Sequence, residues 1–141
     1  MKIVVIDAQG GGVGKSVISA LNTPDRKYEI IAVGTNSAAA SAMLKSGADK
    51  AAVGENAVIV NCRDADIIVG AIGIVIADSM LGEISPAMSV AVAQSRAEKV
   101  LIPFSHGGLH LIGQQNRKLS ESIEEAAQTV FAIIAKKQSS F

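Results

Sequence analysis

The chain has 141 residues, the length of one ordinary domain, and we expect a single domain over residues 1–141. Lysine and arginine total 13, as do aspartate and glutamate, so the formal net charge is zero. No segment combines basic with aromatic side chains, which argues against nucleic acid and anionic membranes as partners.

The length of the apolar runs and the number of cysteines indicate the cellular compartment of the protein. The longest apolar run, residues 67–77, contains two glycines and is shorter than the roughly 20 residues of a membrane span. The single cysteine, Cys62, cannot form an internal disulfide, and the chain opens on a strand-like segment instead of a signal region. We therefore expect a cytoplasmic protein.

The first half of the chain alternates strand and helix signals. A β-branched run at residues 2–7 precedes a glycine-rich segment and a helix predicted at residues 13–21. A second strand at residues 28–34 is followed by an alanine-rich helix that Asn36 or Ser37 can cap and Gly47 can end. After a short strand at residues 49–53, residues 55–63 fit either helix or strand, and we favour helix.

The second half continues the alternation. The next strand is predicted at residues 65–73, and Ser85 with Pro86 marks the start of a helix. A strand at residues 99–104 follows, Leu109–Gly113 can form a last strand, and Ser120 opens a helix that reaches about Lys137. This order predicts a doubly wound α/β fold of Rossmann-like type, with a mostly parallel sheet and helices on both faces.

The segment QGGGVGKS at residues 9–16 fits two phosphate-binding templates in part. In the dinucleotide fingerprint G-x-G-x-x-G, Gly11 and Gly14 match and Gln9 replaces the first glycine. In the P-loop template, Gly14, Lys15 and Ser16 match, and the segment resembles the variant loop of the MinD/ParA ATPases. Those ATPases carry an extra lysine where this chain has Gly10, and they need an acid after a later strand for magnesium. The plain alternative is a tight strand-to-helix turn.

A third template, the loop of the short-chain dehydrogenases, is disfavoured. Those enzymes use a Tyr-x-x-x-Lys pair, whereas the only tyrosine, Tyr28, is followed by Ala32 at that spacing. The second strand ends at neutral residues where an NAD site has an acid, so we expect NADP or another phosphate-bearing nucleotide. The alternative role of Asn36 and Ser37 is a helix cap. The candidate cofactor-binding residues are Gln9, Gly10, Gly11, Gly12, Val13, Gly14, Lys15, Ser16, Thr35, Asn36 and Ser37.

Other side chains give weaker signals. His106 follows a buried strand and could be a catalytic acid or an anion contact, or simply a loop histidine. His106 and His110 have a zinc spacing, but the intervening glycines argue against a helix, and we expect no metal. Asp78 and Glu83 could act as an acid/base pair or as charges at a helix start. The apolar stretch at residues 72–81 would suit the interface of a homodimer.

The segments GGGVGKS (residues 10–16), GTNSAAASAMLKSGAD (34–49) and GENAVIV (54–60) together resemble a family of small uncharacterised bacterial proteins. That family is a domain of unknown function with a Rossmann-like fold, and the resemblance runs from the first strand to the strand at residues 99–104. It implies the fold but no activity. We therefore predict a nucleotide- or dinucleotide-binding protein, with two alternatives: a small NAD(P)-dependent oxidoreductase, or an ATPase with a degenerate P-loop.

Overall fold

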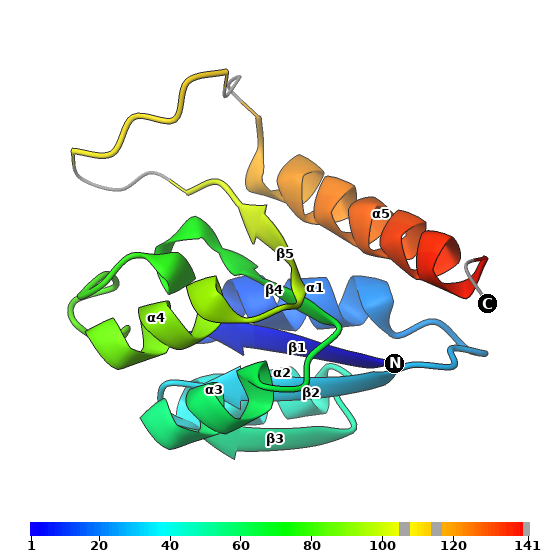
Figure 1. Cartoon of the computed structure of the whole chain (residues 1–141), viewed down its shortest axis with the longest axis horizontal. Coiled ribbons are helices and arrows are strands. Elements are labelled where there is room, and N and C mark those ends of the chain that lie inside the picture. The colour runs from blue at the N-terminus through cyan, green and yellow to red at the C-terminus, as the bar shows by residue number, and fades with distance from the viewer. Residues whose placement is uncertain (105–107, 114–116, 140–141) are drawn as a thin grey trace.

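The computed structural model describes residues 1–104, 108–113 and 117–139. It contains one sheet of five parallel strands with helices on both faces (Figure 1). The elements in chain order are β1 (Lys2–Asp7), α1 (Gly12–Leu21), β2 (Glu29–Gly34), α2 (Ser37–Lys45), β3 (Lys50–Val53), α3 (Glu55–Cys62), β4 (Ile67–Ala71), the 3-10 helix η1 (Ile72–Val75), α4 (Pro86–Gln94), β5 (Glu98–Ile102) and α5 (Leu119–Gln138).

The core consists of two apolar layers, one on each face of the sheet. Successive side chains of a strand point to opposite faces, so each central strand must be apolar at every position. In β1, Ile3 and Val5 pack with helices α1, α2 and α5, whereas Val4 and Ile6 pack with η1, α3 and α4. All four of these side chains are at most 1% exposed. This double burial explains why the strands read as continuous runs of valine, isoleucine and alanine.

The strand order β3-β2-β1-β4-β5 places the first strand at the centre. The chain builds outward through β2 and β3, then crosses to the other side of β1 to form β4 and β5. The loops that follow β1 and β4 therefore lead to opposite faces of the sheet. In open α/β sheets this reversal leaves a crevice at the carboxyl ends of the strands, where ligands bind.

Most of the predicted elements are confirmed. The ambiguous segment at residues 55–63 is a helix, α3, and its side chains Val58 and Cys62 are buried. The Asn36 side chain caps α2 by accepting a hydrogen bond from the Ala39 N–H at 2.8 Å. Ser85 caps α4 in the same way, and Pro86 is the first helical residue. All pairings in the sheet are parallel, as expected for consecutive β-α-β units.

The last strand predicted at Leu109–Gly113 is wrong. The described residues 108–113 are exposed and lie away from the sheet (Figure 1). Gly108 and Gly113 have φ angles of 78° and 87°, so the chain bends at both ends of this short apolar run. Leu109, Leu111 and Ile112 satisfy a strand pattern, but the chain bends on both sides of them and forms no sixth strand over the described residues 108–113.

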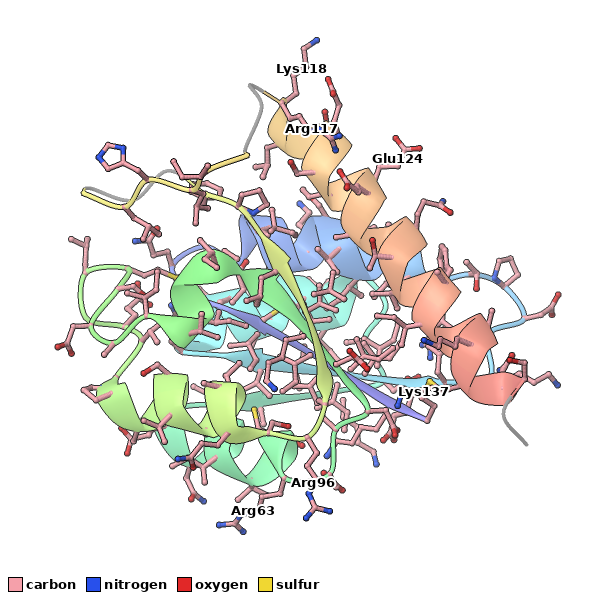
Figure 2. The ribbon with its side chains drawn as sticks, turned by 45° about the horizontal axis from the view of Figure 1, so that its top comes forward. Arg63, Arg96, Arg117, Lys118, Glu124 and Lys137 are labelled. Carbon is pink, nitrogen blue, oxygen red and sulfur yellow. The ribbon has the colours of Figure 1, made fainter. Side chains whose placement is uncertain are left out.

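The surface carries dispersed basic side chains. Figure 2 shows Arg63 and Arg96 at one side of the molecule and Arg117 and Lys118 at the opposite side, beside the start of α5. Across the described ranges, no helix has the length and apolar character needed to cross a membrane. The absence of nucleic-acid partners remains an expectation from composition.

We predict that Gly14→Ala destabilises the fold, whereas Gly12→Ala does not. A Cβ on Gly14 would lie 2.5 Å from Met43 Sδ and 3.0 Å from Asp7 Cβ, and one on Gly12 would meet no atom within 4 Å. Urea unfolding should show a loss of about 1–3 kcal/mol for Gly14→Ala and a change within about 1 kcal/mol for Gly12→Ala. Equal stabilities of the two variants would contradict this account of the packing.

Candidate functional site

The loop that joins β1 to α1 is held by hydrogen bonds to the carboxylate of Asp7, the last residue of β1. Asp7 Oδ1 accepts a hydrogen bond from the Ala8 N–H at 2.8 Å, and Oδ2 accepts one from the Gly14 N–H at 2.7 Å. The Asp7 side chain is buried, and this desolvation raises the pKa of its carboxyl while the backbone N–H groups act to lower it. Asp7 thereby fixes both ends of the segment Ala8–Val13, called the glycine loop below.

Two residues of the glycine loop have positive φ angles. Gln9, at the position of the first fingerprint glycine, has a φ of 52°, so it adopts the left-handed conformation that usually favours glycine. Gly11 has a φ of 75°, and a Cβ there would lie 2.9 Å from the Cα and the carbonyl oxygen of Ala39 in α2. Gly11 is therefore required for the contact between the loop and α2, which the sequence could not indicate.

The four glycines at residues 10, 11, 12 and 14 have different roles. Gly14 permits close packing of α1 on Met43 and β1, and Gly11 permits the approach of α2. A Cβ on Gly10 or Gly12 would meet no atom within 4 Å, and neither residue has a positive φ. Among the described residues, no hydrogen bond engages the backbone N–H of Gly10 or of Gly12. These two glycines are thus not required by the packing around them.

A cavity of about 380 Å³ opens beside the glycine loop. It lies at the carboxyl ends of the strands, next to β1 and β4. Between these two strands the order in which the chain adds strands to the sheet changes direction. The lining also contains apolar side chains, among them Phe104 and Leu119, which are exposed. The lining residues are Asp7, Ala8, Gln9, Gly10, Gly11, Gly12, Val13, Ala71, Met80, Phe104 and Leu119. A larger hollow of about 680 Å³ runs between β5 and α5, and none of the glycine loop lines it.

The residues that follow β2 contact a carboxylate from a distant part of the chain. Glu83 Oε1 accepts hydrogen bonds from the Thr35 hydroxyl at 2.7 Å, the Asn36 amide at 2.9 Å and the Gln9 N–H at 3.1 Å. The Asn36 amide also donates to the Gln9 carbonyl at 2.9 Å. Glu83 therefore links the glycine loop to the carboxyl end of β2, while Ser37 is the exposed first residue of α2.

The sequence favours NADP because no acid follows the second strand, and the position of Glu83 removes this reason. The sequence places only neutral residues after β2, but the structure brings a carboxylate to them, 47 residues or more away along the chain. Hydrogen bonds from Thr35, then Gln9 and Asn36, lower the pKa of Glu83, so this carboxylate is ionised at neutral pH. A negative charge at this point disfavours a 2′-phosphate.

Several other candidates lie outside this arrangement. Lys15 and Ser16 are exposed in the first turns of α1, and neither lines the cavity. The Tyr28 hydroxyl donates to the Leu21 carbonyl at 2.5 Å, near the amino end of β2, so its role is structural. His106 falls outside the described residues. Over the described ranges, no three acidic, histidine or cysteine side chains are grouped to hold a metal.

Side-chain burial bears on two further predictions, the role of Cys62 and the dimer interface. Cys62 is a buried core residue, and burial raises the pKa of its thiol to about 11, as expected for an unreactive cysteine. Within the predicted dimer stretch at residues 72–81, Ile74 is fully buried in the chain itself, whereas Leu81 is 96% exposed. Part of that stretch is therefore internal and part is accessible, and the homodimer stays a prediction.

Comparison with known proteins identifies the family. The family described as a domain of unknown function (DUF3842) matches residues 2–135. The chain belongs to this family. A comparison with curated proteins finds no match. Among solved structures, the chain is similar to a dodecameric FMN-dependent UbiX-like decarboxylase from Escherichia coli O157:H7, at 17% identity and a TM-score of 0.44, covering 93% of this chain and 76% of that chain. A likeness at this level does not identify a ligand for this chain.

We predict that the contribution of Glu83 to stability depends on pH. The folded-state pKa of Glu83 lies below its ordinary value of 4.5, so the ionised group stabilises the folded chain above that pH. The contribution is lost as the pH falls through the lowered pKa. Glu83→Gln should cost up to about 1 kcal/mol at pH 7, because the side chain is partly exposed, and nothing in strong acid.

The measurement is urea unfolding of both proteins from pH 7 downward. Glu29→Gln, at the amino end of β2, is the matched control, because its carboxylate pairs with the exposed Lys50 and Glu29 does not line the cavity. A stability difference between Glu83→Gln and the wild type that stays constant over this pH range would show that the donors around Glu83 do not favour its ionised form.

Proposed function

We propose that the chain binds a small phosphate-bearing ligand of the nucleotide class, with its phosphate against the backbone N–H groups of Gly10 and Gly12. The observation that carries this proposal is that both glycines line the cavity although no packing contact or positive φ requires a glycine there. A close approach of a ligand to the backbone is the remaining physical use of a glycine. The N-terminus of α1 adds a favourable dipole for an anion.

The cavity suits a mononucleotide, or the phosphate-bearing half of a dinucleotide. Its volume of about 380 Å³ is at the small end of ligand sites, which span roughly 300–1,000 Å³. The backbone of the glycine loop and apolar side chains, among them Met80, Phe104 and Leu119, line the same cavity. Such a lining can hold a phosphate on one side and a planar ring on the other.

Asp7 limits the charge of the ligand. Its carboxyl group lines the same cavity, and in the ionised form it opposes an anion, although two N–H groups offset part of that charge. We therefore expect a ligand with one or two phosphate charges instead of a triphosphate. The ATPase alternative is further weakened because β4 ends at Ala71 and β5 at Ile102, neither of which can hold magnesium.

We place binding ahead of catalysis. An oxidoreductase of the short-chain type would need a tyrosine beside the cavity, and the tyrosine of this chain, Tyr28, is committed to the Leu21 carbonyl. NADP, the nucleotide that the sequence favours, is the least suited of the dinucleotides because of Glu83. Lys15 remains a proposed cation for the phosphate, acting from the exposed side of α1.

We predict that Gly12→Asp strongly weakens anion binding without unfolding the protein. An aspartate in the first turn favours a helix, but its charge repels a phosphate at the glycine loop. Titration calorimetry with adenosine 5′-monophosphate and with pyrophosphate should show binding to the wild type and a loss of at least about tenfold in affinity for the variant. Lys15→Met should weaken binding less, and the effect should shrink as salt is added.

The matched control is Asn56→Asp, which adds the same charge to the first turn of α3 at an exposed position that does not line the cavity. It should bind as the wild type does. The proposal fails if the wild type binds neither probe, or if Gly12→Asp and Asn56→Asp bind both probes equally well.

A further inference from the structure

The two carboxylate oxygens of Glu83 have unequal surroundings. All three donors, from Gln9, Thr35 and Asn36, contact Oε1. Across the described part of the chain, no donor contacts Oε2, and the Glu83 side chain is only partly buried. One oxygen thus fixes the position of the carboxylate, and the other retains its capacity to accept hydrogen bonds.

The segment that presents Glu83 has an unusual backbone. Asp78, Met80 and Leu81 have φ angles of 64°, 55° and 57°, and Gly82 follows with 84°. Three non-glycine residues with positive φ within four positions are costly, and such conformations persist where the surrounding structure enforces them. Here the turn is closed by backbone hydrogen bonds, among them those of the Asp78 N–H to the Ile84 carbonyl at 2.8 Å and of the Gly82 N–H to the Asp78 carbonyl at 3.2 Å.

The turn at residues 78–83 contributes one side chain to the cavity and another to the hydrogen bonds that hold Gln9. Met80 lines the cavity, and Glu83, three residues later, contacts Gln9, which also lines it. Gln9 is itself a non-glycine residue with positive φ. Two strained segments from distant parts of the chain therefore meet in the hydrogen bond between Gln9 and Glu83. Gln9 lines the cavity, and Glu83 lies behind it, next to Thr35 and Asn36.

We propose that Glu83 makes the site specific for a ligand whose ribose carries free hydroxyl groups, with Oε2 accepting a hydrogen bond from the ribose and its charge excluding a ribose 2′-phosphate. This inference rests on the proposed function and names the ligand class of the same site. It follows from the position of Glu83 at the carboxyl end of β2, beside Thr35 and Asn36. In a doubly wound fold a carboxylate at that point faces the sugar of a ligand whose phosphate lies at the first loop.

If Glu83 had only a structural role, its substitution would have a different effect from the one expected for ribose recognition. If Glu83 only joins the glycine loop to β2, its substitution weakens all ligands by a similar factor, because the loop itself becomes less ordered. If Oε2 binds the ribose, the substitution changes the ratio between ligands that differ only in their sugar. The ratio of affinities therefore distinguishes recognition from positioning.

The experiment is titration calorimetry of the wild type, Glu83→Gln and Glu29→Gln with four probes. These are adenosine 5′-monophosphate, its 2′-deoxy form, adenosine 2′,5′-bisphosphate and pyrophosphate. The wild type and the Glu29→Gln control should bind the monophosphate about ten- to a hundredfold more tightly than either sugar-altered nucleotide. Glu83→Gln should lose most of this preference, bind the bisphosphate more tightly than the wild type does, and bind pyrophosphate unchanged.

Glu83→Asp is the second variant, because it keeps the charge and shortens the side chain. It should still reject the bisphosphate but lose the preference for the hydroxylated sugar. Equal affinities of the wild type for the three nucleotides, or the same preference in Glu83→Gln, would overturn the role of Glu83 and leave phosphate binding intact. Failure of the wild type to bind even pyrophosphate would overturn the proposed function, and this inference with it.

Discussion

The arrangement of the site depends on the buried Asp7 carboxylate at the end of β1. By accepting hydrogen bonds from Ala8 and Gly14, Asp7 ties the start of the glycine loop to the first turn of α1. The intervening residues must then turn sharply, which forces positive φ angles on Gln9 and Gly11. Gly10 and Gly12 are left without packing partners, beside a cavity. Asp7 therefore shapes a loop suited to an anion, and its own charge moderates how strongly one is held.

Glu83 extends this arrangement across the neighbouring strand. It accepts hydrogen bonds from the glycine loop and from the residues after β2, and so links two adjacent loops at the carboxyl ends of the strands. The turn that carries Glu83 also contributes Met80 to the cavity wall. The cavity is lined by the loops after β1, β4 and β5 and by the start of α5. The residues after β2 are joined to it through Glu83 and Gln9.

The sequence predicts the fold well because the fold is encoded locally. Buried parallel strands must be apolar at every position, and the caps at Asn36 and Ser85 mark where α2 and α4 begin. Residues 109–113 mislead because Leu109, Leu111 and Ile112 fit a strand pattern whether or not a partner strand lies beside them. The site is predicted only in part. The glycine pattern is visible, but the contact of Gly11 with Ala39, and the approach of Glu83 to Thr35, arise from tertiary structure alone.

The most direct test is to follow the backbone amide signals of the glycines by ¹⁵N NMR while adenosine 5′-monophosphate is added. The central claim is that the N–H groups of Gly10 and Gly12 bind the phosphate. The signals of Gly10 and Gly12 should therefore shift in a saturable way, while that of Gly14, whose N–H is held by Asp7, should shift far less. Saturable binding that shifts the amide signals of residues along β5 and α5, and leaves those of Gly10 and Gly12 unchanged, would contradict the claim.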